Sequence, residues 1–337
     1  MTEKLKAPFP YFGGKSSVSD LVWERFGNPL NYVEPFFGSG AVLLSRPTDP
    51  GIETVNDIDG LIANFWRAVK LYPSEVAGYA DWPVNENDLH ARHSWLVGVK
   101  DSLAAQLEGH PEWCDPKIAG WWVWGMCCWI GGGFCSGEGP WLVADGKLVH
   151  LGDAGRGVNR QLVHLGKGRG VNRKRVHLGN AGRGVNRQRE DEGIDIPLLD
   201  WMQRLSDRLK NVRVCCGDWS RVCGPTPTIK QGLTAVFLDP PYHAGTGRDM
   251  GCYTKDDGEV STVVRQWAIT WGSHKDMRIA ICGYEGEHEM PKDWECVAWI
   301  ARGGYGSRGA ETIGRANSKK ERIWFSPNCL RPELNLL

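Results

Sequence analysis

Residues 233–242 read LTAVFLDPPY, an apolar run that ends in a carboxylate, two prolines and a tyrosine. The run at residues 233–238 has the length and composition of a strand that is buried on both faces. The two prolines fix the backbone and remove two amide donors, so nearby carbonyl groups are left free to accept hydrogen bonds. Asp239 and such a carbonyl can both accept from an exocyclic amino group, and Tyr242 can stack on the flat ring that bears it. Asp-Pro-Pro also suits an ordinary turn, so this motif alone leaves two alternatives, a pocket for a planar amine and a plain turn.

Strand-like and helical patterns alternate on both sides of this motif. Strands are predicted at residues 31–37, 52–56, 212–216, 233–238 and 277–282, and helices at 61–72 and 198–210, with another beginning at 41–44. Helix 198–210 is expected to bury one face, formed by Leu198, Leu199, Met202, Leu205 and Leu209. The alternation predicts an α/β fold with a mostly parallel sheet that is covered on both faces. Ligands of such sheets bind beyond the carboxyl ends of the strands.

Four further motifs carry candidate binding residues. In EPFFGSGAV, residues 34–42, Gly38 and Gly40 lie in a strand-to-helix turn where a ligand can approach the backbone. Asp57, in VNDID, ends the second predicted strand and is placed to accept hydrogen bonds from ribose hydroxyls. Lys15 follows two glycines in PYFGGK and is placed to meet a carboxylate. Asp218, in CCGDW, lies at a strand end beside an aromatic residue.

Three copies of a short unit form a basic segment between the two α/β parts. They read VHLGDAGRGVNR from Val149, VHLGKGRGVNR from Val163 and VHLGNAGRGVNR from Val176, and each can form two short strand-like pieces joined by a glycine turn. Residues 147–189 carry eleven Lys and Arg against Asp153 alone, a net charge of +10, whereas the whole chain has 40 basic and 40 acidic side chains. This balance excludes a uniformly basic protein that coats nucleic acid. It leaves the segment either as an arm that tracks phosphates and reads bases or as a solvated low-complexity insertion.

The cysteine spacing and the hydropathy of the chain indicate the cellular compartment in which the protein is expected. The 11 cysteines include no CxxC spacing, which is typical of reduced intracellular thiols and predicts no metal site. The N-terminal residues lack the apolar core of a signal peptide. Residues 118–137 carry no charge, but they are rich in Gly, Trp and Cys and end in a glycine run. We therefore expect a buried helix that leads into a loop, not a membrane span, and a cytoplasmic protein.

The motifs PYFGGK, EPFFGSG, NDID, CGDW and DPPY, in that order, resemble the Dam-type, or alpha-group, adenine-N6 DNA methyltransferases of phages and bacteria. The resemblance covers roughly residues 7–75 and 195–327, and it includes KERIWFSPNC, which is similar to the final strand of family members. It implies a Rossmann-like, mostly parallel methyltransferase sheet that binds S-adenosylmethionine, with an inserted target-recognition region. Residues 1–78 and 195–337 would form the catalytic domain. Residues 79–194, with the basic repeats at 149–189, would form the insertion.

The resemblance also implies a role for each matching residue. Tyr11 and Lys15 would contact the methionine part of S-adenosylmethionine, Asp57 its ribose and Asp218 its adenine. The glycine turn would line the cofactor pocket, and the DPPY residues would hold the target base next to the cofactor. The residues of the turn are Glu34, Phe36, Gly38 and Gly40. The residues at the target base are Asp239, Pro240 and Tyr242, and Asp239 would also line the cofactor pocket.

The activity that the resemblance implies is site-specific methylation of adenine N6 in double-stranded DNA, with the adenine flipped out of the helix and no metal involved. It places the protein in the cytoplasm of a bacterial cell or of a phage-infected host, where a restriction-modification system is one context. The basic arm would contact DNA through Arg156, Arg160, Arg169, Arg173, Arg183 and Arg187.

Two departures from the family pattern and three alternatives remain. Tyr11-Phe12 stands where Dam has Trp-Ala, and the loop after the Trp-rich helix offers Gly133 and Glu138 with no arginine, so its DNA-phosphate role is not carried over. The Trp residues of that helix are expected in the core.

Cytosine N4 is an alternative target, although cytosine-N4 enzymes often have Ser where Asp239 stands. RNA as substrate and a catalytically silent DNA-binding protein are the others.

Deletion of one repeat tests whether the basic segment contacts DNA. Removal of residues 163–175, the second unit, is expected to change or abolish site preference and to reduce the salt dependence of DNA binding, because fewer phosphates are neutralised. Mapping of modified positions and a salt titration of binding measure the two effects. Unchanged site preference would mean that the basic segment does not determine which DNA site is recognised.

Overall fold

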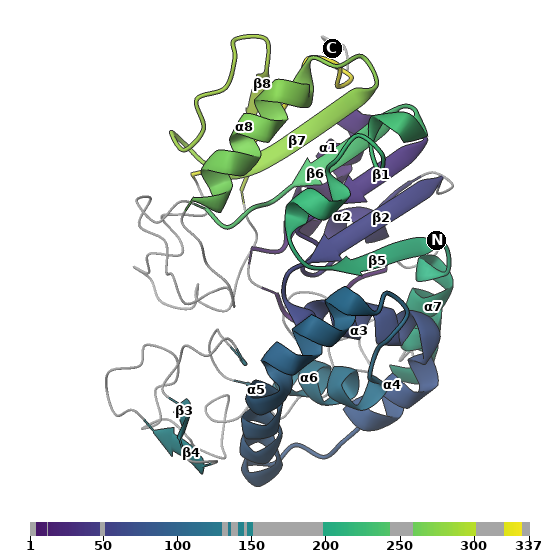
Figure 1. Ribbon diagram of the computed structural model, residues 1–337, viewed down its shortest axis with the longest axis vertical. Helices are drawn as coiled ribbons and strands as arrows, with labels where there is room; N and C mark the ends of the chain where they lie inside the picture. The colour runs from purple at the N-terminus through teal and green to yellow at the C-terminus, as the bar shows by residue number, and fades with distance from the viewer. Residues whose placement is uncertain are drawn as a thin grey trace, which may run out of the picture.

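Seven strands form one twisted sheet in the order β5-β2-β1-β6-β7-β9-β8 (Figure 1). The computed structural model describes residues 5–11, 13–47, 51–129, 134–135, 141–144, 147–150, 198–242, 259–300 and 320–331. The parallel strands are β1 (Asn31–Glu34), β2 (Ile52–Asp57), β5 (Val212–Cys216), β6 (Thr234–Leu238) and β7 (Met277–Tyr284). β9 (Glu321–Phe325) pairs antiparallel with β7 and with β8 (Glu295–Ala298). A separate antiparallel pair is formed by β3 (Trp141–Ala144) and β4 (Lys147–His150).

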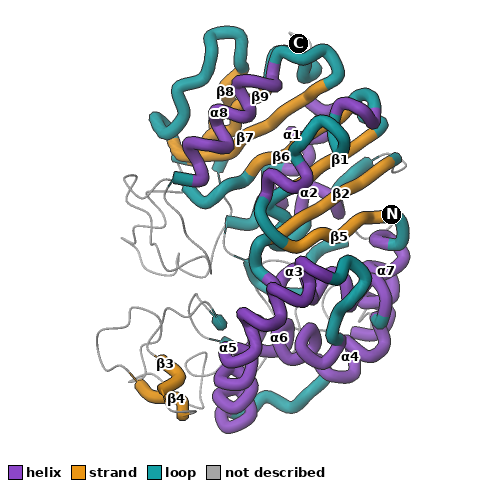
Figure 2. Tube along the Cα trace, in the orientation of Figure 1, coloured by secondary structure: helices purple, strands orange, loops and turns teal. Residues whose placement is uncertain are grey.

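Helices follow the strands as the sequence predicts, and the α/β, Rossmann-like class is confirmed. They are α1 (Ser19–Phe26), α2 (Ala41–Leu44), α3 (Gly60–Leu71), α4 (Pro73–Ala80), α5 (Glu86–Gly109), α6 (Pro116–Cys128), α7 (Leu198–Leu209) and α8 (Val260–Gly272). Figures 1 and 2 show α3 to α7 gathered beside the β5 end of the sheet, whereas α8 lies near β7. The first predicted strand is shorter than expected and ends at Glu34, because Pro35 begins the glycine turn and has no amide to donate.

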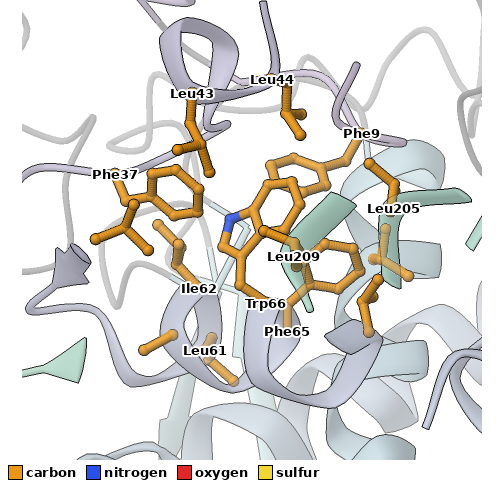
Figure 3. Packing of buried hydrophobic residues seen from close by; sticks show 14 of the residues in the cluster. Phe9, Phe37, Leu43, Leu44, Leu61, Ile62, Phe65, Trp66, Leu205 and Leu209 are labelled. Carbon is orange, nitrogen blue, oxygen red and sulfur yellow. The ribbon is translucent and has the colours of Figure 1, made fainter. Parts of the chain in front are cut away.

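Both faces of the sheet are buried, as expected for parallel strands covered by helices. In β6, Ala235 and Phe237 belong to the core on the α3 side, whereas Val236 and Leu238 pack in the core that includes residues of α8. Trp66 of α3 is fully buried in the first of these cores, among Phe9, Phe37, Leu43 and Phe65 (Figure 3). The alternation of apolar residues therefore fixes which side of each strand faces which layer of helices.

The prediction for α7 is correct for the helix but wrong for one residue of its buried face. Leu199 is 46% exposed, whereas Trp201, which the periodic pattern left out, is 1% exposed. Trp201 fills this face instead, and its indole N–H donates to the carbonyl of Lys6 at 3.2 Å. The segment before β1 thus supplies a partner that sequence periodicity does not reveal.

The uncharged Trp-rich stretch forms the buried helix α6, which confirms that prediction. Asp115 caps its first turn by accepting from the amides of Lys117 and Ile118, and Trp122 and Trp124 lie in the core. None of the helices in the described ranges is long and apolar enough to cross a lipid bilayer. The ten cysteines that the structure describes are free thiols.

The close approach of α4 and α6 depends on Gly120. A Cβ atom there would lie 2.9 Å from the carbonyl oxygen of Val76 and would also clash with the side chain of Tyr79. We expect Gly120→Ala to lower the free energy of unfolding by about 1–3 kcal/mol through overpacking. Gly98→Ala is the matched control, because nothing lies within 4 Å of a Cβ in that position of α5. It should raise stability by about 0.5–1 kcal/mol. Urea unfolding measures both, and equal effects of the two variants would contradict the packing argument.

Candidate active site

The carboxyl ends of the five parallel strands meet at one edge of the sheet. Glu34, Asp57 and Tyr284 are the last residues of β1, β2 and β7, and Asp239 directly follows β6. β9 runs in the opposite direction, so its first residue, Glu321, pairs with Tyr284 at this same edge. The fold therefore brings the sequence-predicted carboxylates together and adds Glu321, which the sequence analysis did not single out.

The glycine turn between β1 and α2 is held by residues of β2 and α3. The side-chain amide of Asn56 donates to the carbonyl of Pro35 at 3.1 Å. Asp57 Oδ2 accepts from the amide of Gly38 at 2.9 Å. On the other side of the turn, the buried indole of Trp66 donates to the Gly38 carbonyl at 2.9 Å. These three bonds fix the turn before any ligand binds.

Gly38 and Gly40 are required by the backbone itself. Their φ angles are +47° and +63°, in the left-handed region that favours glycine. A Cβ at Gly38 would clash with the ring of Tyr11, and a Cβ at Gly40 would lie 2.7 Å from the ring of Phe37. The structure thus places Tyr11 directly against the turn, so two motifs that the sequence treats separately form one surface.

Asp57 combines burial with two backbone hydrogen bonds. It accepts from the amides of Gly38 and Asp59, both at 2.9 Å. Burial, followed by the charge of Asp59, raises the pKa of Asp57 to about 7, although these hydrogen bonds oppose the rise. A carboxyl group with this pKa takes up or releases a proton near neutral pH, and the lone pairs that the amides leave free can accept from hydroxyl groups.

Asp218 and an aromatic pair lie after β5. Asp218 is exposed, and its Oδ1 accepts from the amide of Ser220 at 3.0 Å to cap a short helical turn, Trp219–Val222. Trp219 stacks on Phe36 of the glycine turn, with ring centroids 6.3 Å apart and ring planes 26° apart. Both rings are partly exposed. Flat apolar rings beside carboxylates suit the adenine and ribose of a nucleoside.

Glu34 lies beneath the turn and not on its surface. It is 2% exposed, and it accepts a hydrogen bond from the hydroxyl of Tyr32 at 2.8 Å. Burial raises the pKa of Glu34 to about 8, so this carboxyl group is mostly protonated at neutral pH. Its contacts are those of a structural polar group under the pocket lining.

Lys15 forms an ion pair with Asp239. Lys15 Nζ lies 2.7 Å from Asp239 Oδ2 and donates to the carbonyl of Gly13 at 2.8 Å. The sequence predicts that Lys15 meets a carboxylate, and that of Asp239 lies beside it. Contact of Lys15 with the cofactor stays a prediction. Burial raises the pKa of Asp239, and the charge and hydrogen bond of Lys15 act against that rise. The lysine therefore favours the ionised, hydrogen-bond-accepting form of the Asp239 carboxyl.

Tyr242 is held at its hydroxyl end. Its O–H donates to Glu321 Oε2 at 2.8 Å, and its ring packs edge-on against Tyr284 with centroids 4.6 Å apart. Lys15 Nζ lies 5.5 Å from the centroid of the Tyr242 ring. Burial also raises the pKa of Glu321. The one signal for Glu321 in the sequence is an acidic residue at the start of the apolar run in KERIWF.

Glu287 supports this cluster from the loop after β7. It accepts from the hydroxyl of Ser261 at 2.7 Å and from the amide of Tyr284 at 2.9 Å. It ties the start of α8 to the end of β7 and so fixes the backbone beside the ring that contacts Tyr242. No sequence motif pointed to Glu287 or Tyr284, because both act through contacts between distant segments.

Several predicted residues lie outside the described residues. These are the six arginines of the basic arm, Arg156, Arg160, Arg169, Arg173, Arg183 and Arg187, together with Phe12, Gly133 and Glu138. The first repeat enters the described part only at Val149 and His150, which belong to β4. Within the described ranges, no group of three or more His, Cys, Asp or Glu side chains is placed to hold a metal ion.

Comparison with known proteins supports the resemblance. Residues 11–87 match the family model described as D12 class N6 adenine-specific DNA methyltransferase. The matched part contains Tyr11, Lys15, the glycine turn and Asp57. No curated protein matches the chain. The match confirms that this N-terminal part of the chain is similar to N6 adenine-specific DNA methyltransferases.

Proposed function

We propose that the protein is a site-specific DNA methyltransferase that moves a methyl group from S-adenosylmethionine to N6 of adenine. The observation that carries this proposal is the Asp239 carboxylate, held at the end of β6 by Lys15 and followed by the two prolines and the anchored ring of Tyr242. A fixed acceptor beside a flat ring is what recognition of an aromatic amine requires.

S-adenosylmethionine would bind along the neighbouring strand ends. Tyr11 and Lys15 would face its amino-acid part, Asp57 its ribose, and Asp218 with the Phe36 and Trp219 rings its adenine. The fit rests on the braced glycine turn, on a carboxyl group that can accept from hydroxyls, and on the partly exposed aromatic pair. When bound, S-adenosylmethionine supplies an electrophilic methyl carbon on its sulfur atom.

Asp239 would activate the adenine amino group by accepting a hydrogen bond from it. Lys15 pairs with Oδ2 and Tyr242 also hydrogen-bonds to this carboxylate, but a carboxylate has about four lone-pair positions, so it can still accept from the amino group. The Pro240 carbonyl would be the second acceptor. Two acceptors that favour a more tetrahedral nitrogen return its lone pair from the ring. The nitrogen would then bond to the methyl carbon as the methyl–sulfur bond breaks and its electron pair stays on sulfur, and the Asp239 carboxylate would take the proton that the nitrogen releases.

The target adenine would have to leave the DNA helix, because its amino group is otherwise buried in a base pair. Flipping costs a few kcal/mol, which contacts in the pocket must offset. Tyr242 would stack on the flipped base, and Glu321 fixes the orientation of that ring through its hydroxyl.

Recognition of the DNA site would belong to residues 79–194, inserted between the catalytic parts 1–78 and 195–337. The support is the net charge of +10 over residues 147–189, which suits contact with phosphates and base edges. The reaction would take place in the cytoplasm of a bacterial cell or a phage-infected host.

Methyl transfer from labelled S-adenosylmethionine to unmodified DNA, with mass analysis of the nucleosides, tests the proposal. We expect N6-methyladenine, and we expect Asp239→Ala to lower kcat by at least about a hundredfold while DNA binding persists, because an acceptor in the transition state is lost. Asp200→Ala, at an exposed position of α7, is the matched control and should keep wild-type activity.

Each other product has a definite meaning. If the product is N4-methylcytosine, the proposed methyl-transfer chemistry holds, but the target base is cytosine instead of adenine. Methylated RNA with unmodified DNA would replace DNA by RNA. Full turnover by Asp239→Ala, or no product on any nucleic acid, would refute the proposal.

The Lys15–Asp239 pair predicts a shift in the pH dependence of the reaction. Activity requires ionised Asp239, so the rate should rise with pH through the pKa of that carboxyl. Lys15→Met removes the charge that opposes the effect of burial, so the rising limb should move to higher pH. Rates at saturating S-adenosylmethionine, measured from acidic to alkaline pH, report the shift.

Lys15→Arg keeps the positive charge and serves as the control for this shift. Its profile should lie close to that of the wild type, even if its maximal rate is lower. A Lys15→Met profile that differs from the wild type in height alone would contradict a role for Lys15 in holding Asp239 ionised.

A further inference from the structure

A cavity of about 830 Å³ lies among α4, α5 and α6, away from the strand ends. It is lined by Glu75, Gly78, Tyr79, Trp82, Asp88, Ala91, Arg92, Trp95 and Trp121. Glu108, near the other end of α5, pairs with Arg221 at 2.7 Å, beside the Asp218 turn. Sixteen residues of helix separate Arg92 from Glu108, which is about 24 Å, so this cavity is distinct from the candidate active site.

The walls of the cavity are aromatic and partly open to solvent. Tyr79, Trp82 and Trp95 are 40%, 45% and 40% exposed, and Trp95 packs edge-on against Trp121 with centroids 5.3 Å apart. Large aromatic side chains exposed together around a cavity of this size are typical of ligand sites.

Arg92 gives the cavity a buried hydrogen-bond donor. It is 7% exposed, and its guanidinium carbon lies 4.4 Å from the ring centroid of Trp124, 5.0 Å from that of Trp121 and 5.2 Å from that of Trp82. Nη1 is buried and has no hydrogen-bond partner among the described residues. A guanidinium with five N–H donors and little access to water favours an incoming acceptor.

The rings around Arg92 are fixed before any ligand arrives. The indole of Trp82 donates to Asp88 Oδ2 at 2.7 Å, and the Asn85 amide donates to the same oxygen at 2.6 Å. The indole of Trp124 donates to the carbonyl of Trp82 at 2.9 Å. Preorganised walls of this kind reduce the ordering that binding would otherwise require.

The charged side chains around the cavity disfavour two classes of ligand, organic cations and polyanions. Trp121 already has Arg92 at 5.0 Å and Lys117 Nζ at 4.6 Å from its ring centroid, so an organic cation would meet two like charges. Glu75 and Asp88 line the same cavity, so a phosphate placed inside it would meet two like charges, and a nucleotide would have to keep its phosphate outside. A flat, uncharged ring that carries acceptors meets neither penalty.

We propose that this cavity binds a nucleobase that carries a carbonyl oxygen, with guanine as the best fit. The ring would stack on the exposed faces of Trp82 and Trp95, its O6 and N7 would accept from Arg92, and its N–H groups would donate to Glu75. Adenine has no carbonyl oxygen and presents an amino group where guanine has O6. The base comes from a free nucleotide or from an unpaired position in a nucleic acid strand, and the site does not depend on the proposed methyl transfer.

Equilibrium binding of the full chain to guanosine monophosphate, adenosine monophosphate and short single-stranded oligonucleotides tests this proposal. We expect guanine-containing probes to bind at least about tenfold more tightly than adenine-containing ones, because loss of a hydrogen-bonded carbonyl leaves Arg92 unpaired. Trp95→Leu and Arg92→Met should each weaken guanine binding by about tenfold or more. Tyr72→Leu changes a ring that is 45% exposed but does not line the cavity, so it should have no effect.

The probes also separate the two sources of the base. Binding of the mononucleotide identifies a free nucleotide as ligand, and binding of guanine oligonucleotides alone identifies a base within a strand. Equal affinity for adenine and guanine, no binding of any probe, or binding that survives both cavity substitutions would overturn the proposal. Trp95→Leu removes an exposed ring and keeps the test decisive if Arg92→Met fails to fold. Methyl transfer at adenine, measured on the same variants, reports separately on the other site.

Discussion

The ion pair between Lys15 and Asp239 joins the N-terminal segment to the end of β6. Lys15 precedes the first strand, and Asp239 follows β6, yet their charged atoms lie 2.7 Å apart. Because both side chains are largely removed from water, loss of either partner would leave a buried charge without compensation. The pair therefore fixes the N-terminal segment over the strand ends, and the contacts of Tyr11 with the glycine turn and of Lys15 with the Tyr242 ring depend on that placement.

Burial of several carboxyl groups at one edge sets the electrostatics of the site. Burial raises the pKa of Glu34, Asp57, Asp239 and Glu321, and Lys15 acts against this rise at Asp239 and Glu321. The Glu34 carboxyl instead accepts from the Tyr32 hydroxyl and stays mostly protonated at neutral pH. Lys15 thus favours the ionised form of Asp239 and Glu321, whereas hydrogen bonds oppose the effect of burial at Glu34 and Asp57.

Local sequence signals predicted the strands but not the partners of their side chains. β5 and β6 follow from apolar runs bounded by turns. The contact of Glu321 with Tyr242 depends on β9 returning antiparallel beside β7, a pairing that no local pattern encodes. Trp201 replaced Leu199 on the buried face of α7 for a similar reason, because its partner, Lys6, is distant in sequence. The tryptophan rings around Arg92 also come together only because α5 packs against α6, which no local pattern reveals.

Helix α5 connects the cavity to the strand ends as a rigid element. Its C-terminal part lies against the start of α3, where Gly60 leaves room for the Ala104 backbone, and Glu108 reaches the turn after β5. Its N-terminal part carries Asp88, Arg92 and Trp95 in the cavity wall. A helix does not shorten or bend easily, so the separation of about 24 Å between Arg92 and Glu108 is fixed by helix geometry. At the stacked spacing of about 3.4 Å per nucleotide, a nucleic acid strand that reached both places would have about seven nucleotides between them.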